Sequence, residues 1–246
     1  MGGSKSGRDL LYGLPLGVPW ATLTLVASCV VVTVPLFFDP ARYYLILGTG
    51  FCEQENTLHW YHPMLSEFVH GAGCGFPPTW LHLAINTGLL LFHGAMFERL
   101  LGSARFVLLT GTNLVFSTIL SERLVGGRVH GASDMAWSYG LFIALVLTTR
   151  WRDRRWRMFG EPLTTVVAFW LLLAVFGLIK HWHLWSVLIS VPYFLAWRRE
   201  LAAQLGRDSR APTRADHAAS VSCMVLLAFN LVMVLLAVLG VLGSDS

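Results

Sequence analysis

Apolar residues occur along this chain in seven long stretches, separated by short polar, glycine-containing or proline-containing segments. Most of these stretches approach the roughly 20 residues that an α-helix needs to cross the hydrocarbon core of a bilayer. The pattern therefore predicts seven membrane-spanning helices. The expected spans cover residues 19–38, 79–96, 106–120, 133–149, 163–179, 183–197 and 218–242.

The composition favours a membrane protein over a soluble domain. Hydrophobic residues make up 55% of the 246 residues and charged residues 13%, and the mean hydropathy is +0.59. A soluble domain usually has about a quarter of its residues charged. We therefore expect an all-α, polytopic membrane protein with a single six-helix core. Its expected parts are an N-terminal segment 1–18, the core 19–197, a linker 198–217, and a seventh helix with its tail 218–246.

Arginine placement predicts the orientation. The net charge of +4 comes largely from arginine clusters at 150–157 and 198–214. Cytoplasmic loops carry an excess of Lys and Arg, so we expect both clusters and the N-terminus to be cytoplasmic. The long loop 41–77 is then external. These clusters flank apolar spans, so they indicate topology and not a nucleic-acid partner. We expect a multi-pass protein of a bacterial cell membrane.

Polar side chains open three of the predicted spans. His82 and Asn86 lie at the start of span two, Ser133 and Ser138 in span four, and His183 at the start of span six. Polar groups at membrane depth are costly and usually mark a functional site. With seven spans, the starts of spans two, four and six lie on the same, external side. The topology thus predicts that these residues share one depth.

These residue types fit acyl transfer. A serine hydroxyl becomes a strong nucleophile when a nearby histidine removes its proton, and Ser133 and His183 could form such a pair. The reaction also needs donors for the oxyanion. His82 and Asn86 are four residues apart and so share one helix face. The N–H of Ser133, near a helix N-terminus, is a further candidate donor.

This arrangement resembles the rhomboid intramembrane serine proteases over about residues 78–197. The second helix of that family has His-x-x-x-Asn, then an acidic residue and a Leu-Gly-Ser turn. Here these are His82, Asn86, Glu98 and Leu101-Gly102-Ser103. The segment Gly131-Ala132-Ser133 resembles the start of the family's Gly-x-Ser-Gly, and His183 resembles its base. The resemblance implies six core helices, with Ser133 as nucleophile. Glu98 and Arg99, which close span two, are expected to brace the turn that follows and not to touch substrate.

The serine motif departs from the family pattern at its fourth position. Asp134 stands where rhomboids have glycine. An ionised carboxylate there would repel a developing oxyanion, although Asp134 could instead cap span four or be protonated. Ser138 is the alternative nucleophile. It lies about 140° around the helix from Ser133 and roughly 7.5 Å deeper, so both cannot face His183 equally.

The leading hypothesis is an intramembrane serine peptidase that cleaves membrane-protein substrates through Ser133 and His183. Its expected partners are a transmembrane protein substrate and the lipid bilayer, without a small-molecule cofactor. Loop histidines 59, 62 and 70 lack a recognised ligand spacing, so no metal is expected. The alternative is a catalytically inactive rhomboid-like protein that binds transmembrane helices, and a small transporter ranks third. Pairing of Cys52 with Cys74 stays open.

Overall fold

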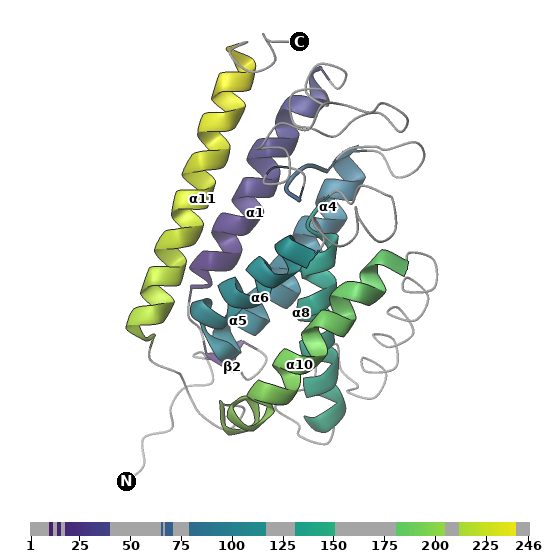
Figure 1. Cartoon of the computed structure of the whole chain (residues 1–246), viewed down its shortest axis with the longest axis vertical. Helices are drawn as coiled ribbons and strands as arrows, with labels where there is room; N and C mark the ends of the chain where they lie inside the picture. The colour runs from purple at the N-terminus through teal and green to yellow at the C-terminus, as the bar shows by residue number, and fades with distance from the viewer. Residues whose placement is uncertain are drawn as a thin grey trace.

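The computed structural model describes residues 10–11, 14–15, 18–39, 65, 67–70, 79–116, 131–150, 181–204 and 212–239 (Figure 1). These residues are helical apart from turns and one small hairpin. In the hairpin, β1 (Leu10–Leu11) pairs antiparallel with β2 (Leu14–Pro15), and Leu10 lies opposite Pro15. The expected all-α class is confirmed.

The helices of the described part follow the predicted spans. The first span is α1 (Trp20–Thr33), extended by the 3-10 turn η1 (Val34–Phe37). The second is one continuous rod made of α4 (Thr79–Leu89), the π-helical turn η2 (Leu90–Gly94) and α5 (Ala95–Leu101). The other helices are α6 (Ser103–Val115), α8 (Ser133–Arg150), α10 (His181–Gln204) and α11 (Arg214–Val238).

Three segments of the described chain are long and apolar enough to cross a membrane. They are Trp20–Phe37, Thr79–Leu101 and Arg214–Val238, which match the first, second and seventh predicted spans. The expected fifth span, 163–179, lies outside the described residues, as do Cys52 and Cys74. The count of six core helices plus one therefore stays a prediction.

Two helices extend beyond the apolar stretches that predicted them. Helix α10 continues past Trp197 to Gln204, and α11 begins at Arg214, four residues before the expected start. The extension of α10 carries Glu200, whose Oε1 accepts from Arg105 Nη1 at 2.7 Å. The early start of α11 comes from a capping box, in which the Asp216 N–H donates to Thr213 Oγ1 and the Asp216 carboxylate accepts from the Thr213 N–H. Polar contacts thus extend these helices beyond the region that hydropathy detects.

Glu98, at the end of α5, joins three helices at one end of the bundle. Its carboxylate accepts from the N–H groups of Ala21 and Thr22 at 3.0 and 2.8 Å, and from Thr22 Oγ1 at 2.8 Å. It also accepts from Ser103 Oγ, in the first turn of α6, at 2.6 Å. Helix α1 has no side-chain cap of its own, so Glu98 satisfies N–H groups that would otherwise be unpaired. The expectation that Glu98 braces this turn is confirmed.

The same end is tied to the seventh helix. Asp216 Oδ1 accepts from the N–H of Ala104 at 3.0 Å, which fixes the start of α11 to the start of α6. Helix α11 then runs beside α1 along the length of the bundle (Figure 1). We call this region, with Glu98, Ser103, Ala104, Arg105 and Asp216, the Glu98 end.

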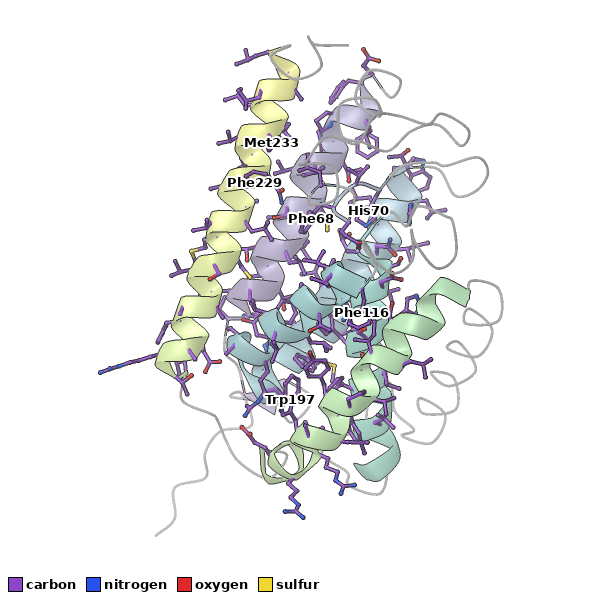
Figure 2. All side chains as sticks on the ribbon, in the orientation of Figure 1. Phe68, His70, Phe116, Trp197, Phe229 and Met233 are labelled. Carbon is purple, nitrogen blue, oxygen red and sulfur yellow. The ribbon has the colours of Figure 1, made fainter. Side chains whose placement is uncertain are left out.

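Aromatic residues fill the core between α5, α6, α8 and α10. The Phe97 ring lies 4.8 Å from Phe142 and 5.4 Å from Tyr139, and Trp197 closes the cluster from α10 (Figure 2). Tyr139 also stacks on Phe106. Large apolar side chains on the outer helix faces are exposed, among them Trp80, Leu108, Val225 and Leu235. Such faces suit contact with lipid.

Candidate functional site

The starts of α4, α8 and α10 converge at the end of the bundle opposite Glu98. Ser138 of α8 contacts the backbone of Ser186 in α10, and Asn86 of α4 lies against Gly131, just before α8. A short turn, residues 67–70, packs into the same region. Figure 2 shows Phe68 and His70 of this turn between α1 and α4. Asn86 thus lies beside the turn that precedes Ser133, and the His82 ring lies against His70 of the neighbouring turn.

His70 is the central side chain of this region. Its Nε2 accepts from the N–H of Ala132 at 3.2 Å, so its Nδ1 carries the proton and donates to the Phe68 carbonyl at 3.0 Å. The N–H of His70 donates to Thr33 Oγ1, near the end of α1, at 3.0 Å. One buried residue thus connects α1, the 67–70 turn and the start of α8 through its backbone N–H and its ring.

His70 is held in its neutral form. Burial lowers its pKa to about 3, with a further contribution from the neighbouring His82 and opposition from the bond to the Phe68 carbonyl. A neutral imidazole is required here, because Nε2 can accept from Ala132 only while it is unprotonated. The described geometry therefore depends on a histidine that stays uncharged across the physiological range.

The sequence analysis missed this role and grouped His70 with His59 and His62 in one loop. The residues that precede it gave one weak signal. His70 follows Leu65, Phe68 and Val69, which are buried, so the loop turns inward at this point. His59 and His62 lie outside the described residues.

Gly131 has no side chain, which allows the backbone before Ser133 to pack closely against its neighbours. Its φ of 89° is a conformation that glycine adopts readily and other residues avoid. A Cβ on this residue would lie 3.0 Å from His70 Cδ2 and 3.3 Å from Asn86 Nδ2. The turn before Ser133 can therefore pack directly against both side chains.

His82 and Asn86 both point toward this turn, as their four-residue spacing predicts. The His82 ring is half-buried and lies 5.2 Å from the His70 ring in an edge-on arrangement. Asn86 is buried, and its Nδ2 has no hydrogen-bond partner. A buried amide donor without an acceptor is uncommon in a folded protein and calls for an explanation. Its neighbour Gly131 lies two residues before the candidate nucleophile.

Ser133 and Asp134 form the first turn of α8, and both are buried. Their residues are 8% and 3% exposed. The N–H of Ala132 donates to His70. The next backbone N–H along the chain belongs to Ser133, the first residue of α8, and is not bound by this histidine. A helix N-terminus presents its first N–H groups toward negative charge.

Ser138 has a different environment from Ser133. Its Oγ lies 2.8 Å from Asn113 Oδ1 of α6 and 2.8 Å from the Ser186 carbonyl of α10. The single hydroxyl proton is therefore shared between two acceptors. Asn113 in turn donates through Nδ2 to the Leu109 carbonyl. Ser138 thus links three helices through buried hydrogen bonds.

His183 lies in the first turn of α10, three residues before Ser186. The side chain of His183 lies outside the described part of the chain. Within the residues that are described, no group of three or more His, Cys, Asp or Glu side chains could hold a metal ion.

A family model described as the Rhomboid domain matches residues 59–193, more than half of the chain. The chain belongs to the rhomboid family. The match confirms the resemblance first seen in His82, Asn86 and Glu98. In this rhomboid the matched region also begins earlier than residue 78, so it includes His70. No curated protein and no solved structure matches the chain.

Family membership and the apolar helices make this rhomboid an integral membrane protein. Its orientation in the bilayer stays a prediction from the arginine clusters. The roles of Ser133, His183, His82 and Asn86 are likewise predictions, and they are developed as a proposal below.

Proposed function

We propose that this rhomboid is an intramembrane serine peptidase with Ser133 as nucleophile and His183 as its base. The observation that supports this most strongly is the unpartnered Nδ2 of Asn86, buried beside the turn that carries Ser133. A preorganised donor that lacks an acceptor in the resting protein suits a negative charge that exists only in the transition state. Rhomboids are typically proteases of this kind.

In the proposed reaction, His183 takes the proton of Ser133 as its Oγ attacks the carbonyl carbon of a peptide bond. The resulting oxyanion accepts from Asn86, His82 and the N–H of Ser133. His183 then gives the proton to the leaving amine, and an acyl-enzyme remains on Ser133. Water, activated by the same histidine, hydrolyses this ester and restores the serine.

The bonding of Ser138 supports Ser133 as the nucleophile. Ser138 already shares its proton between Asn113 and the Ser186 carbonyl. A serine used this way would have to break two buried hydrogen bonds before a histidine could take its proton. Ser133, at the N-terminus of α8, has the more suitable position.

The proposed substrate is a membrane protein cleaved in or near a transmembrane segment. The arginine clusters favour a cytoplasmic N-terminus and a site toward the external face. Helices α4, α8 and α10 all begin toward this face, so water could enter the site there.

A fluorophosphonate probe tests the proposal, because it reacts with an activated serine. With protein purified in detergent, we expect labelling of the wild type, loss of labelling in Ser133→Ala and retention in Ser138→Ala. Asn86→Ala should slow labelling by about 10²-fold, the usual effect of losing one oxyanion donor.

Two outcomes would contradict this assignment. Labelling lost only in Ser138→Ala would move the nucleophile to Ser138. A wild-type protein that is folded, takes no label and leaves a model transmembrane substrate intact would be the inactive, helix-binding relative instead.

A further inference from the structure

Glu67 is a buried carboxyl group that the proposed reaction does not use. It lies in the 67–70 turn and is 1% exposed. Neither Oε1 nor Oε2 has a hydrogen-bond partner. An ionised carboxylate without a partner is among the most costly groups to bury, so such groups usually hold a proton instead.

The turn that carries Glu67 is fixed next to the start of α8. His70, three residues after Glu67, bonds the N–H of Ala132 at 3.2 Å. Ala132 is two residues before Asp134, which is buried as well. The His70 contact therefore holds the turn that carries Glu67 against the start of the helix that carries Asp134.

Among the described residues, none of the groups found near Glu67 supplies a positive charge to it. Cys29 of α1 and Asp134 of α8 lie within electrostatic reach of it. His70 of its own turn is neutral, and the His82 ring of α4 packs edge-on against the His70 ring. Burial raises the pKa of Glu67 well above its usual range, and the charge of Asp134 raises it further.

We propose that Glu67 is the proton-holding partner of Asp134. The two carboxyl groups retain a proton at neutral pH, so the pair adds no more than one negative charge beside Ser133. Two carboxylates close together in a buried site cannot easily ionise at the same time. Asp134 is the residue that replaces the family's glycine, and Glu67, by holding a proton, adds no second negative charge beside it.

For the reaction, this inference rests on the proposed function. A developing oxyanion near Ser133 is less strongly opposed by one carboxylate than by two. Glu67 therefore acts by holding the proton of the pair, and it does not touch the substrate. The proton-holding pair itself is a property of the folded protein and can be tested without any activity.

Infrared spectroscopy provides a direct test. The C=O stretch of a protonated carboxyl group differs from the bands of a carboxylate. In the full chain at neutral pH, we expect a buried protonated-carboxyl band that is absent from Glu67→Gln and still present in Glu98→Gln, the matched control with four hydrogen-bond donors. A wild-type spectrum without the band, or a Glu67→Gln spectrum that retains it, would overturn the proposal.

The pH dependence of thermal stability is the second measurement. Since its folded-state pKa is raised, Glu67 contributes stability that is complete below the unfolded value and is lost as pH rises through the folded value. From about pH 7.5 to about pH 9, where an ordinary histidine is mostly neutral, the Tm of the wild type should fall more than that of Glu67→Gln. Equal curves would count against the pair. So would stabilisation by Na⁺ or Ca²⁺ that Glu67→Gln abolishes, because the pair would then bind a metal ion.

These results separate the inference from the proposed function. An infrared band lost in Glu67→Gln, in a protein whose Ser133 takes no fluorophosphonate, supports the pair and refutes the peptidase. Labelled Ser133 without the band refutes the pair and keeps the peptidase. If both hold, the rate of labelling should fall toward alkaline pH in the wild type, and the fall should be reduced in Glu67→Gln.

Discussion

The packing around Gly131 leaves too little room for an added Cβ atom. Replacing Gly131 with Ala would place a methyl group 3.0 Å from the His70 ring, in a backbone conformation that costs a non-glycine residue about 1–2 kcal/mol. We expect Gly131→Ala to lower the free energy of unfolding by at least this amount and to suppress fluorophosphonate labelling. Thermal denaturation and labelling measure the two effects. Gly88→Ala, inside α4, is the control, because a Cβ there meets nothing within 4 Å, and it should lower neither the stability nor the labelling.

Glu98 is the residue with the largest expected effect on stability. Its replacement by Ala leaves the N–H groups of Ala21 and Thr22 buried without acceptors, at about 1–3 kcal/mol each. We expect Glu98→Ala to destabilise the protein by about 2–4 kcal/mol, measured as a fall in Tm. Glu200→Gln, which breaks a half-exposed ion pair with Arg105, should cost less than about 1 kcal/mol. A comparable loss of stability in both variants would show that the buried hydrogen bonds of Glu98 contribute no more than the Arg105–Glu200 ion pair.

At this scale the sequence predicted some contacts and missed others for a physical reason. His82 and Asn86 were predicted to share a face because helical periodicity fixes the direction of side chains four residues apart. Glu98 was found through its place in a family motif. His70 and Glu67 lie in a turn without periodicity, and His70 meets Ala132 across 62 residues. No local pattern encodes such a contact.

Among the elements, α11 is attached at its start by one short motif. The Thr213 and Asp216 side chains cap this helix, and Asp216 also accepts from Ala104 of α6. We expect Asp216→Ala to destabilise the protein by about 1–2 kcal/mol, since it removes a cap and a contact between helices. Asp216→Asn, which retains an acceptor, should recover part of the loss. A Tm unchanged in Asp216→Ala would mean that packing against α1 alone positions α11.

The element bounds show where hydropathy stops being informative. The apolar stretches placed α1 and the start of α4 within about one residue of their observed positions. They ended α10 at Trp197 and began α11 at Ala218, because charged residues follow and precede these points. The helices continue through those charges, since Arg105 pairs with Glu200 and a capping box begins α11. Hydropathy measures burial in lipid, whereas hydrogen bonds set the ends of helices.

For the whole molecule, we expect the stability of the fold at acidic pH to depend on His70. Its pKa is about 3 when folded, against 6.5 for an ordinary histidine, so the unfolded chain binds a proton that the folded chain excludes. Stability should therefore be complete above about pH 6.5 and fall as the pH drops toward 3, by up to about 1.4 kcal/mol per pH unit. Tm measured across this range checks the sign. His70→Asn should show a shallower acid slope than the wild type, and an equal slope would assign the effect to other histidines.

The π-helical turn η2 sets the angular phase between the two ends of the bundle. A rod of plain α-helix would advance by about 100° for each residue, and a π turn accommodates one extra residue without lengthening the rod by a full step. Asn86 lies before η2 and Glu98 after it. Rewinding Leu90–Gly94 as plain α-helix, with no residue removed, would turn Glu98 by roughly one residue step, about 100°, relative to Asn86. The helix could then keep Asn86 beside Gly131 or Glu98 in contact with the start of α1, but not both. The π-helical turn therefore keeps both contacts in place at once.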